Sequence, residues 1–241
     1  MGGEGDSAGK PASSASAPKR HYHGHRERLR ARILKGDGSA LAKYELLELL
    51  LCAFIPRIDV KPIAKALIAR FGSVSAALAA SPERLTEIPG VGESAAAYLR
   101  ATHLLLQAAA GDQVKERPVI SNWAALLNYV RMTLRHETAE QVRTPFLDRK
   151  NRLIADEVTG RGTVDHAPVY PREIARRALE LAASSVILVH NHPSGDPTPS
   201  RADVEMTREI ETALKALDIR LHDHLVVGKA DTVSMKAKGL I

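Results

Sequence analysis

Hydrophobic positions follow two different periods along this chain. Between residues 41 and 109, apolar side chains return every three or four positions, which is the spacing of one buried helix face. The helices predicted by this pattern cover residues 44–54, 60–71, 73–80, 82–87 and 93–109. This part of the chain is therefore predicted to form a small all-α domain.

From residue 119 onward, short apolar runs rich in β-branched residues alternate with amphipathic stretches. They predict strands at residues 142–147, 152–155, 157–164, 186–189, 219–227 and 232–235, and helices at residues 123–134, at 171–183 and from residue 200. Pro145 removes a hydrogen-bond donor from the first strand, which predicts an edge position or a bulge. The whole pattern predicts an α/β fold, with a mixed sheet flanked by helices.

Two polar stretches divide the chain. Residues 1–18 are rich in Gly, Ser, Ala and Pro, so we expect a disordered tail. Residues 111–117 are polar and charged and precede Pro118, so we expect a linker there. The predicted organisation is a helical domain over residues 19–115 followed by an α/β domain over residues 119–241.

The residues best suited to chemistry follow the buried run 186–189. His190 and His192 come at its end, and because side chains on a strand alternate between faces, both imidazoles project the same way. A loop rich in proline comes next, after which Ser200 is a good N-cap that places Asp203 in the first turn of a helix. Two imidazoles and one carboxylate suit zinc, and three protein ligands leave one position open, as in catalytic zinc sites.

Each part of this arrangement also has an ordinary explanation. Ser-x-x-Asp is close to a capping box, in which Asp203 only stabilises the helix start. Histidines near a strand end are often plain polar residues, and Asp196 in the loop competes with Asp203 for a metal ion. His222 and His224 form a second pair without a following carboxylate, so we interpret them as structural or as support for a ligand.

The spacing of the whole segment is more specific than its parts. His-x-His-Pro, six residues and Ser-x-x-Asp resemble the zinc motif of the JAMM (MPN-plus) metallopeptidases at every defined position. The strings HNHPSGDPTPS and GTVDHAPVYPREI resemble the bacterial RadC proteins more closely still. This resemblance implies a JAMM-type, cytidine deaminase-like domain over residues 119–241, with one zinc ion per chain held by His190, His192 and Asp203. It also implies hydrolysis of a peptide or isopeptide bond.

Such a hydrolase needs a further carboxylate that accepts the proton of the attacking water. In the JAMM family this glutamate opens the first strand after the first helix of the domain, and Glu140 holds the matching place. Spacing alone does not separate Glu140 from Glu137 and Glu157, so both remain alternatives. The resemblance further implies that Ser200 steadies the oxyanion formed by the attack.

Residues 85–95 of the helical domain resemble a helix-hairpin-helix motif. Gly90 and Gly92 would let backbone amides at the start of the next helix approach a phosphate, which implies weak DNA binding without sequence preference. The alternative is a turn that needs glycine for positive φ and packs Val91 inward. Acidic neighbours of the glycines count against strong affinity.

The distribution of charge favours an anionic partner for the first half. Of the net charge of +6, residues 1–118 carry +5 and residues 119–241 carry +1. A basic run over residues 19–35 can touch phosphate. The alternative is a solvated helix that packs Leu29, Ile33 and Leu34 inward.

Three classes of function remain open: a zinc-dependent peptidase or isopeptidase, a DNA-binding accessory protein with a non-catalytic metal site, and a metal-dependent phosphoesterase. The first is favoured, because phosphoesterases more often gather two metal ions and the ligands of only one are visible here. The expected partners are a peptide or protein substrate and weakly bound DNA. With Cys52 as the single cysteine and no apolar stretch of membrane-spanning length, we expect a cytoplasmic protein without membrane contact.

Overall fold

The computed structural model of the chain describes residues 22–36, 41–56, 58–162 and 169–241. The chain forms two compact units, one ending at Ala66 and one spanning Leu67–Ile241. The tail expected over residues 1–18 and the start of the basic run, residues 19–21, lie outside the described residues.

The helices are α1 (Tyr22–Lys35), α2 (Lys43–Phe54), α3 (Lys61–Phe71), α4 (Val74–Ala79), α5 (Pro82–Thr86), α6 (Glu93–Lys115), α7 (Trp123–Leu134), α8 (Pro171–Glu180) and α9 (Arg201–Lys215), with a 3-10 helix at Val119–Asn122. The strands are β1 (Gln141–Leu147), β2 (Leu153–Arg161), β3 (Ser185–Asn191), β4 (Arg220–Val227) and β5 (Thr232–Ser234). The all-helical N-terminal region and the C-terminal sheet with helices follow the prediction. Within the described ranges, no helix combines the length and the apolar character needed to cross a membrane.

In the first unit, α1 packs on α2, and His25 of α1 lies beside Glu48 of α2. Leu29 is buried and Ile33 is partly buried, whereas Leu34 is 84% exposed, so the alternative that all three pack inward is wrong for Leu34. His25 Nε2 lies 2.8 Å from Glu48 Oε1, and burial raises the pKa of Glu48. Burial also raises the pKa of the Cys52 thiol, which agrees with an inert cysteine.

The turn between α5 and α6 has a backbone that requires one of its two glycines. Gly90 has φ 90°, a left-handed conformation that glycine adopts without steric cost. Val91 is buried and donates its N–H to Ile88 O at 3.0 Å, so the turn packs inward here. Gly92 is the N-cap of α6 with φ −82°, and a Cβ added there would meet no atom within 4 Å. Gly92 is therefore open to solvent and is not required by the backbone.

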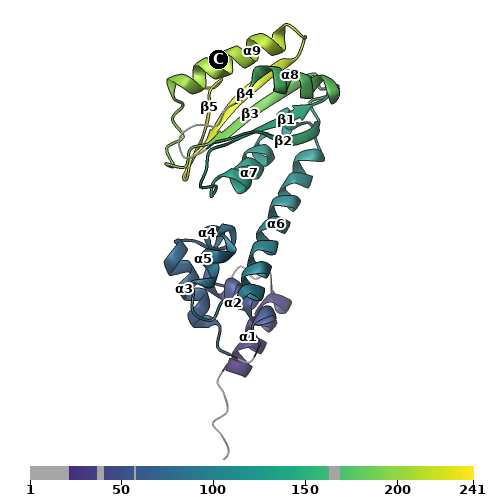
Figure 1. Cartoon of the computed structure of the whole chain (residues 1–241). Coiled ribbons are helices and arrows are strands. Elements are labelled where there is room, and N and C mark those ends of the chain that lie inside the picture. Colours follow the sequence, from purple (N-terminus) through teal and green to yellow (C-terminus); the bar gives the residue numbers. More distant parts are fainter. Residues whose placement is uncertain (1–21, 37–40, 57, 163–168) are drawn as a thin grey trace, which may run out of the picture. The chain divides into compact units, whose positions relative to one another are not determined.

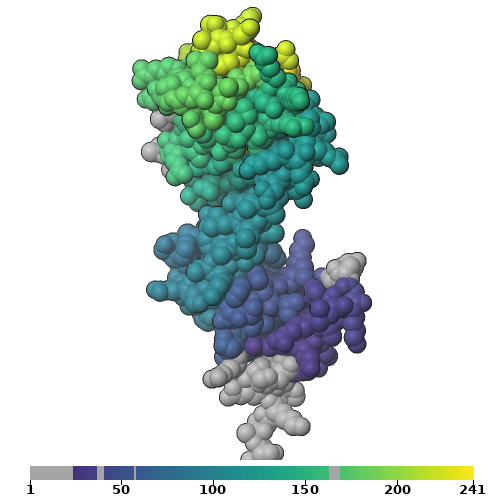
Figure 2. Space-filling model, turned by 90° about the vertical axis from the view of Figure 1, so that its right-hand side faces the viewer, coloured from purple at the N-terminus to yellow at the C-terminus, as the bar shows by residue number. Residues whose placement is uncertain are grey.

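Helix α6 continues to Lys115, so the linker expected at residues 111–117 is mostly helical. Val114 is fully buried and belongs, with Leu126 of α7, to a core cluster beneath the sheet. Apolar contacts therefore outweigh the polar composition of this segment. Figure 2 shows the teal surface of α6 adjoining the green surface of the sheet region, and α6 contacts β2. The domain boundaries at residues 115 and 119 stay a prediction.

The sheet has the strand order β2-β1-β3-β4-β5. Strands β3 and β4 are parallel and the other neighbours are antiparallel, which makes the sheet mixed, as predicted. Helices α8 and α9 cover one face, whereas α7 and the end of α6 cover the other (Figure 1). All residues of β3 are buried, so its C-terminal end lies in the most enclosed part of the sheet.

One detail of the strand prediction is wrong. The two strands predicted between residues 152 and 164 are the single strand β2, and the end of that range lies outside the described residues. Strand β1 lies between β2 and β3, so Pro145 is not at an edge. The register of β1 with β2 shifts on both sides of Pro145, and its pairs with β3 flank the proline at Arg143 and Phe146. The sheet thus accommodates the missing donor through a local irregularity, which was the other predicted possibility.

Candidate metal centre

The end of β3 brings two imidazoles together on the face covered by α9. His190 is fully buried near the end of β3, and His192 is the first residue after the strand. The N–H of His192 donates to Val227 O at 3.0 Å, which prolongs the contact with β4 beyond the last strand residue. The Nε2 atoms of His190 and His192 lie 2.9 Å apart. The alternation of side chains on a strand therefore places the two rings as predicted.

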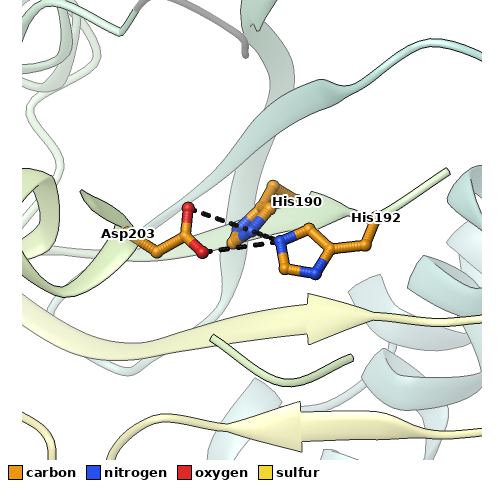
Figure 3. Close-up of side chains that lie close together, drawn as sticks. All are labelled: His190, His192 and Asp203. Atoms are coloured by element: carbon orange, nitrogen blue, oxygen red, sulfur yellow. Dashed lines mark hydrogen bonds and ion pairs between the residues drawn. The ribbon is translucent and has the colours of Figure 1, made fainter. Parts of the chain in front are cut away.

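Helix α9 adds a carboxylate from its first turn. Ser200 is the N-cap, and its Oγ accepts the N–H of Asp203 at 3.1 Å. Asp203 Oδ1 lies 3.5 Å from His190 Nε2, and Oδ2 lies 3.4 Å from His192 Nε2 (Figure 3). One possible ligand atom from each of the three side chains lies within 4.8 Å of the other two. The group of His190, His192 and Asp203 can therefore hold one metal ion.

The electrostatics of the group suit a cation. Burial alone would raise the pKa of Asp203, but hydrogen bonds and charge from the two histidines outweigh it and hold that pKa well below its usual value. The hydrogen bond to Asp203 is the main cause that raises the pKa of His192, and the charge of Glu140 contributes as well. Asp203 is thus a carboxylate at neutral pH, and the charge of Glu140 also favours the protonated form of His192.

The loop between β3 and α9 fixes the orientation of His192. His192 Nδ1 lies 2.8 Å from the carbonyl oxygen of Asp196, and because a carbonyl only accepts, this nitrogen carries a proton. The lone pair available for a metal ion is therefore on Nε2, the atom that faces Asp203. The carboxylate of Asp196 accepts from the N–H and the hydroxyl of Thr198 instead. Asp196 therefore supports His192 and does not belong to the group that can hold a metal ion.

Asn191 points to the opposite side of the strand and holds the segment that carries Glu140. Its Nδ2 donates to Ala139 O at 3.1 Å, and its Oδ1 accepts the N–H of Gln141 at 2.9 Å. These two bonds fall on the residues immediately before and after Glu140, which is 9% exposed. The buried strand end therefore fixes Glu140 on both sides.

The structure separates the three glutamates that spacing left open. Glu137 is exposed. Glu157 is paired with Arg177, whose Nη2 lies 2.7 Å from Glu157 Oε1, and these hydrogen bonds lower the pKa of Glu157. Of the three, Glu140 is the one whose charge acts on His192.

Two residues lie behind His190: His224, which the sequence offered as possible support for a ligand, and Thr207, which sequence reasoning did not find. His224 is fully buried, and its Nε2 lies 2.7 Å from His190 Nδ1, while its Nδ1 lies 2.6 Å from the hydroxyl of Thr207. His222 instead lies 2.9 Å from Asn151 Oδ1, away from the group. Of the second histidine pair, His224 is thus the one beside a candidate ligand. The one available signal for Thr207 was its place one helical turn after Asp203.

A family model described as "RadC-like JAB domain" matches residues 120–240 of the chain. The matched range includes the sheet, helices α7 to α9, the three residues that can hold a metal ion, and Glu140. This match confirms the family that the motifs resemble.

Proposed function

The chain belongs to the family of proteins with a RadC-like JAB domain, and from this premise we propose that it is a zinc-dependent hydrolase of peptide or isopeptide bonds. His190, His192 and Asp203 would hold one zinc ion, since two nitrogens and one carboxylate oxygen are a donor set that zinc accepts. Held by these residues, zinc would activate a water molecule for attack near neutral pH.

Glu140 is proposed as the group that takes the proton of the attacking water and passes it to the leaving amine. None of the three ligands is free for this task, so another carboxylate is required. The observation that carries this assignment is the buried position of Glu140, between two residues that Asn191 anchors. The pairing of Glu157 with Arg177 supports the same choice.

Ser200 is proposed to have two roles. Its hydroxyl donates to Asp203 Oδ2 at 2.7 Å, so its first role is to orient the carboxylate. In the second role, the hydroxyl turns away from Asp203 and donates to the negative oxygen that develops on the substrate carbonyl.

The test is a comparison of Glu140→Gln with wild type for metal content and for turnover of peptide, isopeptide and nucleic-acid substrates. Glu140→Gln should keep zinc, because no ligand is changed, and should lose about 10²- to 10⁴-fold in turnover, the usual contribution of positioned proton transfer. Glu157→Gln is the matched control and should keep both, because that carboxylate is engaged by Arg177.

Each outcome of this comparison has a definite meaning. Wild-type protein that purifies without metal and refuses zinc at neutral pH would contradict the zinc site. Full activity in Glu140→Gln would remove Glu140 from the mechanism. Cleavage of DNA and not of peptides, abolished by His190→Ala, would favour the phosphoesterase.

A second proposal concerns the helical region, for which we infer weak DNA binding through a helix-hairpin-helix motif. The support is the turn before α6, where Gly92 caps the helix without a side chain and has open space around it. The first amides of a helix favour an anion, so a phosphate can approach them there. Glu93 in the first turn opposes this approach, which agrees with weak affinity.

A further inference from the structure

We propose that Thr207 and His224 form a buried positioning pair that sets the tautomer of His190 and thereby directs its Nε2 lone pair to the metal position. The inference rests on the proposed zinc site and adds two residues that support it. Three contacts between polar atoms run from helix α9 through β4 to β3, and each one fixes which of its two atoms carries the proton.

The chain starts at the hydroxyl of Thr207. Its Oγ1 lies 2.5 Å from the carbonyl oxygen of Asp203, one helical turn earlier, and 2.6 Å from His224 Nδ1. The carbonyl has no proton, so the single hydroxyl proton must lie between the two oxygens, since they would otherwise repel each other at this distance. Thr207 Oγ1 is then left as an acceptor, and His224 Nδ1 must carry a proton.

His224 passes this constraint on to the next ring. His224 is fully buried, and because a buried imidazole disfavours the charged form, it has only one ring proton. Because that proton is on Nδ1, Nε2 is an acceptor. The atom that lies 2.7 Å from it, His190 Nδ1, must therefore be the donor.

His190 consequently offers its lone pair on Nε2, the nitrogen that faces His192 and Asp203. His192 reaches the same state by a separate route, through the carbonyl of Asp196. Two nitrogen lone pairs and a carboxylate thus converge on one point, which is an arrangement of acceptors that calls for a cation. One turn of α9 supplies both a ligand, Asp203, and the hydroxyl that sets the tautomer of another ligand.

The substitution Thr207→Val tests the first contact, because it removes the hydroxyl and keeps a branched side chain. The Nδ1–H of His224 then loses its acceptor, and the other tautomer of His224 donates from Nε2 to His190 Nδ1. The proton of His190 moves to Nε2, where it competes with the metal ion. Zinc affinity, measured by competition with a chelator, should fall about 10- to 100-fold, the usual effect of losing a residue that supports a ligand.

Thr207→Ser is the matched control, because it keeps the hydroxyl and loses one methyl group. Its zinc affinity should stay close to wild type, even where its thermal stability drops as much as that of Thr207→Val. Wild-type zinc affinity in Thr207→Val would overturn the proposal, and so would an equal loss in Thr207→Ser, because packing would then explain the effect.

A direct readout needs no substitution. Long-range ¹H–¹⁵N correlation spectra of the zinc-loaded protein distinguish protonated from unprotonated ring nitrogens, and His224 should show Nδ1 protonated and Nε2 bare. The opposite tautomer overturns the proposal. If the protein takes up no zinc, the proposed function fails, yet the same spectrum of the zinc-free protein still decides the tautomer of His224.

Discussion

Asp203 shows how one side chain serves two purposes. Its Oδ2 accepts the N–H and the hydroxyl of Ser200, each at 2.7 Å, which completes the capping box. Its Oδ1 stays directed at His190. Capping and metal binding are therefore compatible explanations, because the cap holds the carboxylate in the orientation that the proposed metal site needs.

Asn191 of β3 connects the two histidines to the segment that carries Glu140. The residues on either side of it face α9, so Asn191 itself faces the opposite side, where its amide meets the segment that carries Glu140. Three consecutive residues therefore hold both the metal position and the proposed base.

Asn191→Ala is accordingly predicted to separate these two tasks. Zinc content should be unchanged, because both histidines stay in place, whereas kcat on a peptide substrate should fall by up to about 10²-fold, since a small displacement of a catalytic group has costs of that size. Metal analysis and steady-state kinetics on the same preparation check this. Unchanged turnover would remove the positioning role, and a parallel loss of zinc would indicate general damage to the strand end.

Among the larger elements, the loop between β3 and α9 packs on the turn between β4 and β5. Lys229 N–H donates to Gly195 O at 3.0 Å, and Gly195 has φ 96°. A Cβ on Gly228 would lie 2.4 Å from Gly195 O and 2.8 Å from Pro197 Cδ. Two glycines thus permit a close backbone contact, and the loop held there carries the Asp196 carbonyl that orients His192.

Gly228→Ala is therefore predicted to push the loop away and to weaken zinc binding. Relief of such an overlap costs about 1–3 kcal/mol of stability, and zinc affinity should fall with it, because His192 loses its fixed acceptor. Thermal unfolding and zinc competition measure the two effects. Gly92→Ala is the control for zinc affinity, since its added Cβ has open space and lies outside the loop. Wild-type zinc affinity in Gly228→Ala would contradict the role given to the loop.

At the scale of the whole molecule, the two proposals fall on different parts of the chain. The family match covers residues 120–240, with the proposed metal site and base. The turn proposed to meet DNA precedes this range and lies before α6. The hydrolase proposal and the DNA proposal can therefore fail independently.

The DNA proposal predicts that the full-length chain binds duplex DNA weakly and with strong salt dependence. The logarithm of the binding constant should fall linearly with the logarithm of salt concentration, by about 0.9 for each phosphate neutralised. Glu93→Gln should raise affinity roughly two- to five-fold, the equivalent of about 0.3–1 kcal/mol for one charge at a helix start. Fluorescence anisotropy measures both, with Glu211→Gln on α9 as the control. No binding at low salt would leave the turn with a packing role alone.

Helices, strands and the spacing of the candidate ligands could be predicted from the sequence, because they depend on residues close together in the chain. The helical and strand periods predicted most helices and strands, because burial of one face acts through side chains only a few positions apart. The candidate ligands were predictable for the same reason, since His190, His192 and Asp203 lie within one strand end, one loop and one helical turn.

Side-chain contacts between residues far apart in the chain became visible in the tertiary structure alone. His190 and His224 are 34 positions apart, and Asn191 is 50 positions from Gln141, so no local period relates them. The same limit applies to residues 111–115 and to Pro145, because the buried face of α6 and the interior place of β1 depend on neighbours that come later in the chain. The proposal of Glu140 over its competitors likewise rests on packing, because burial and partners, and not spacing, distinguish one glutamate from another.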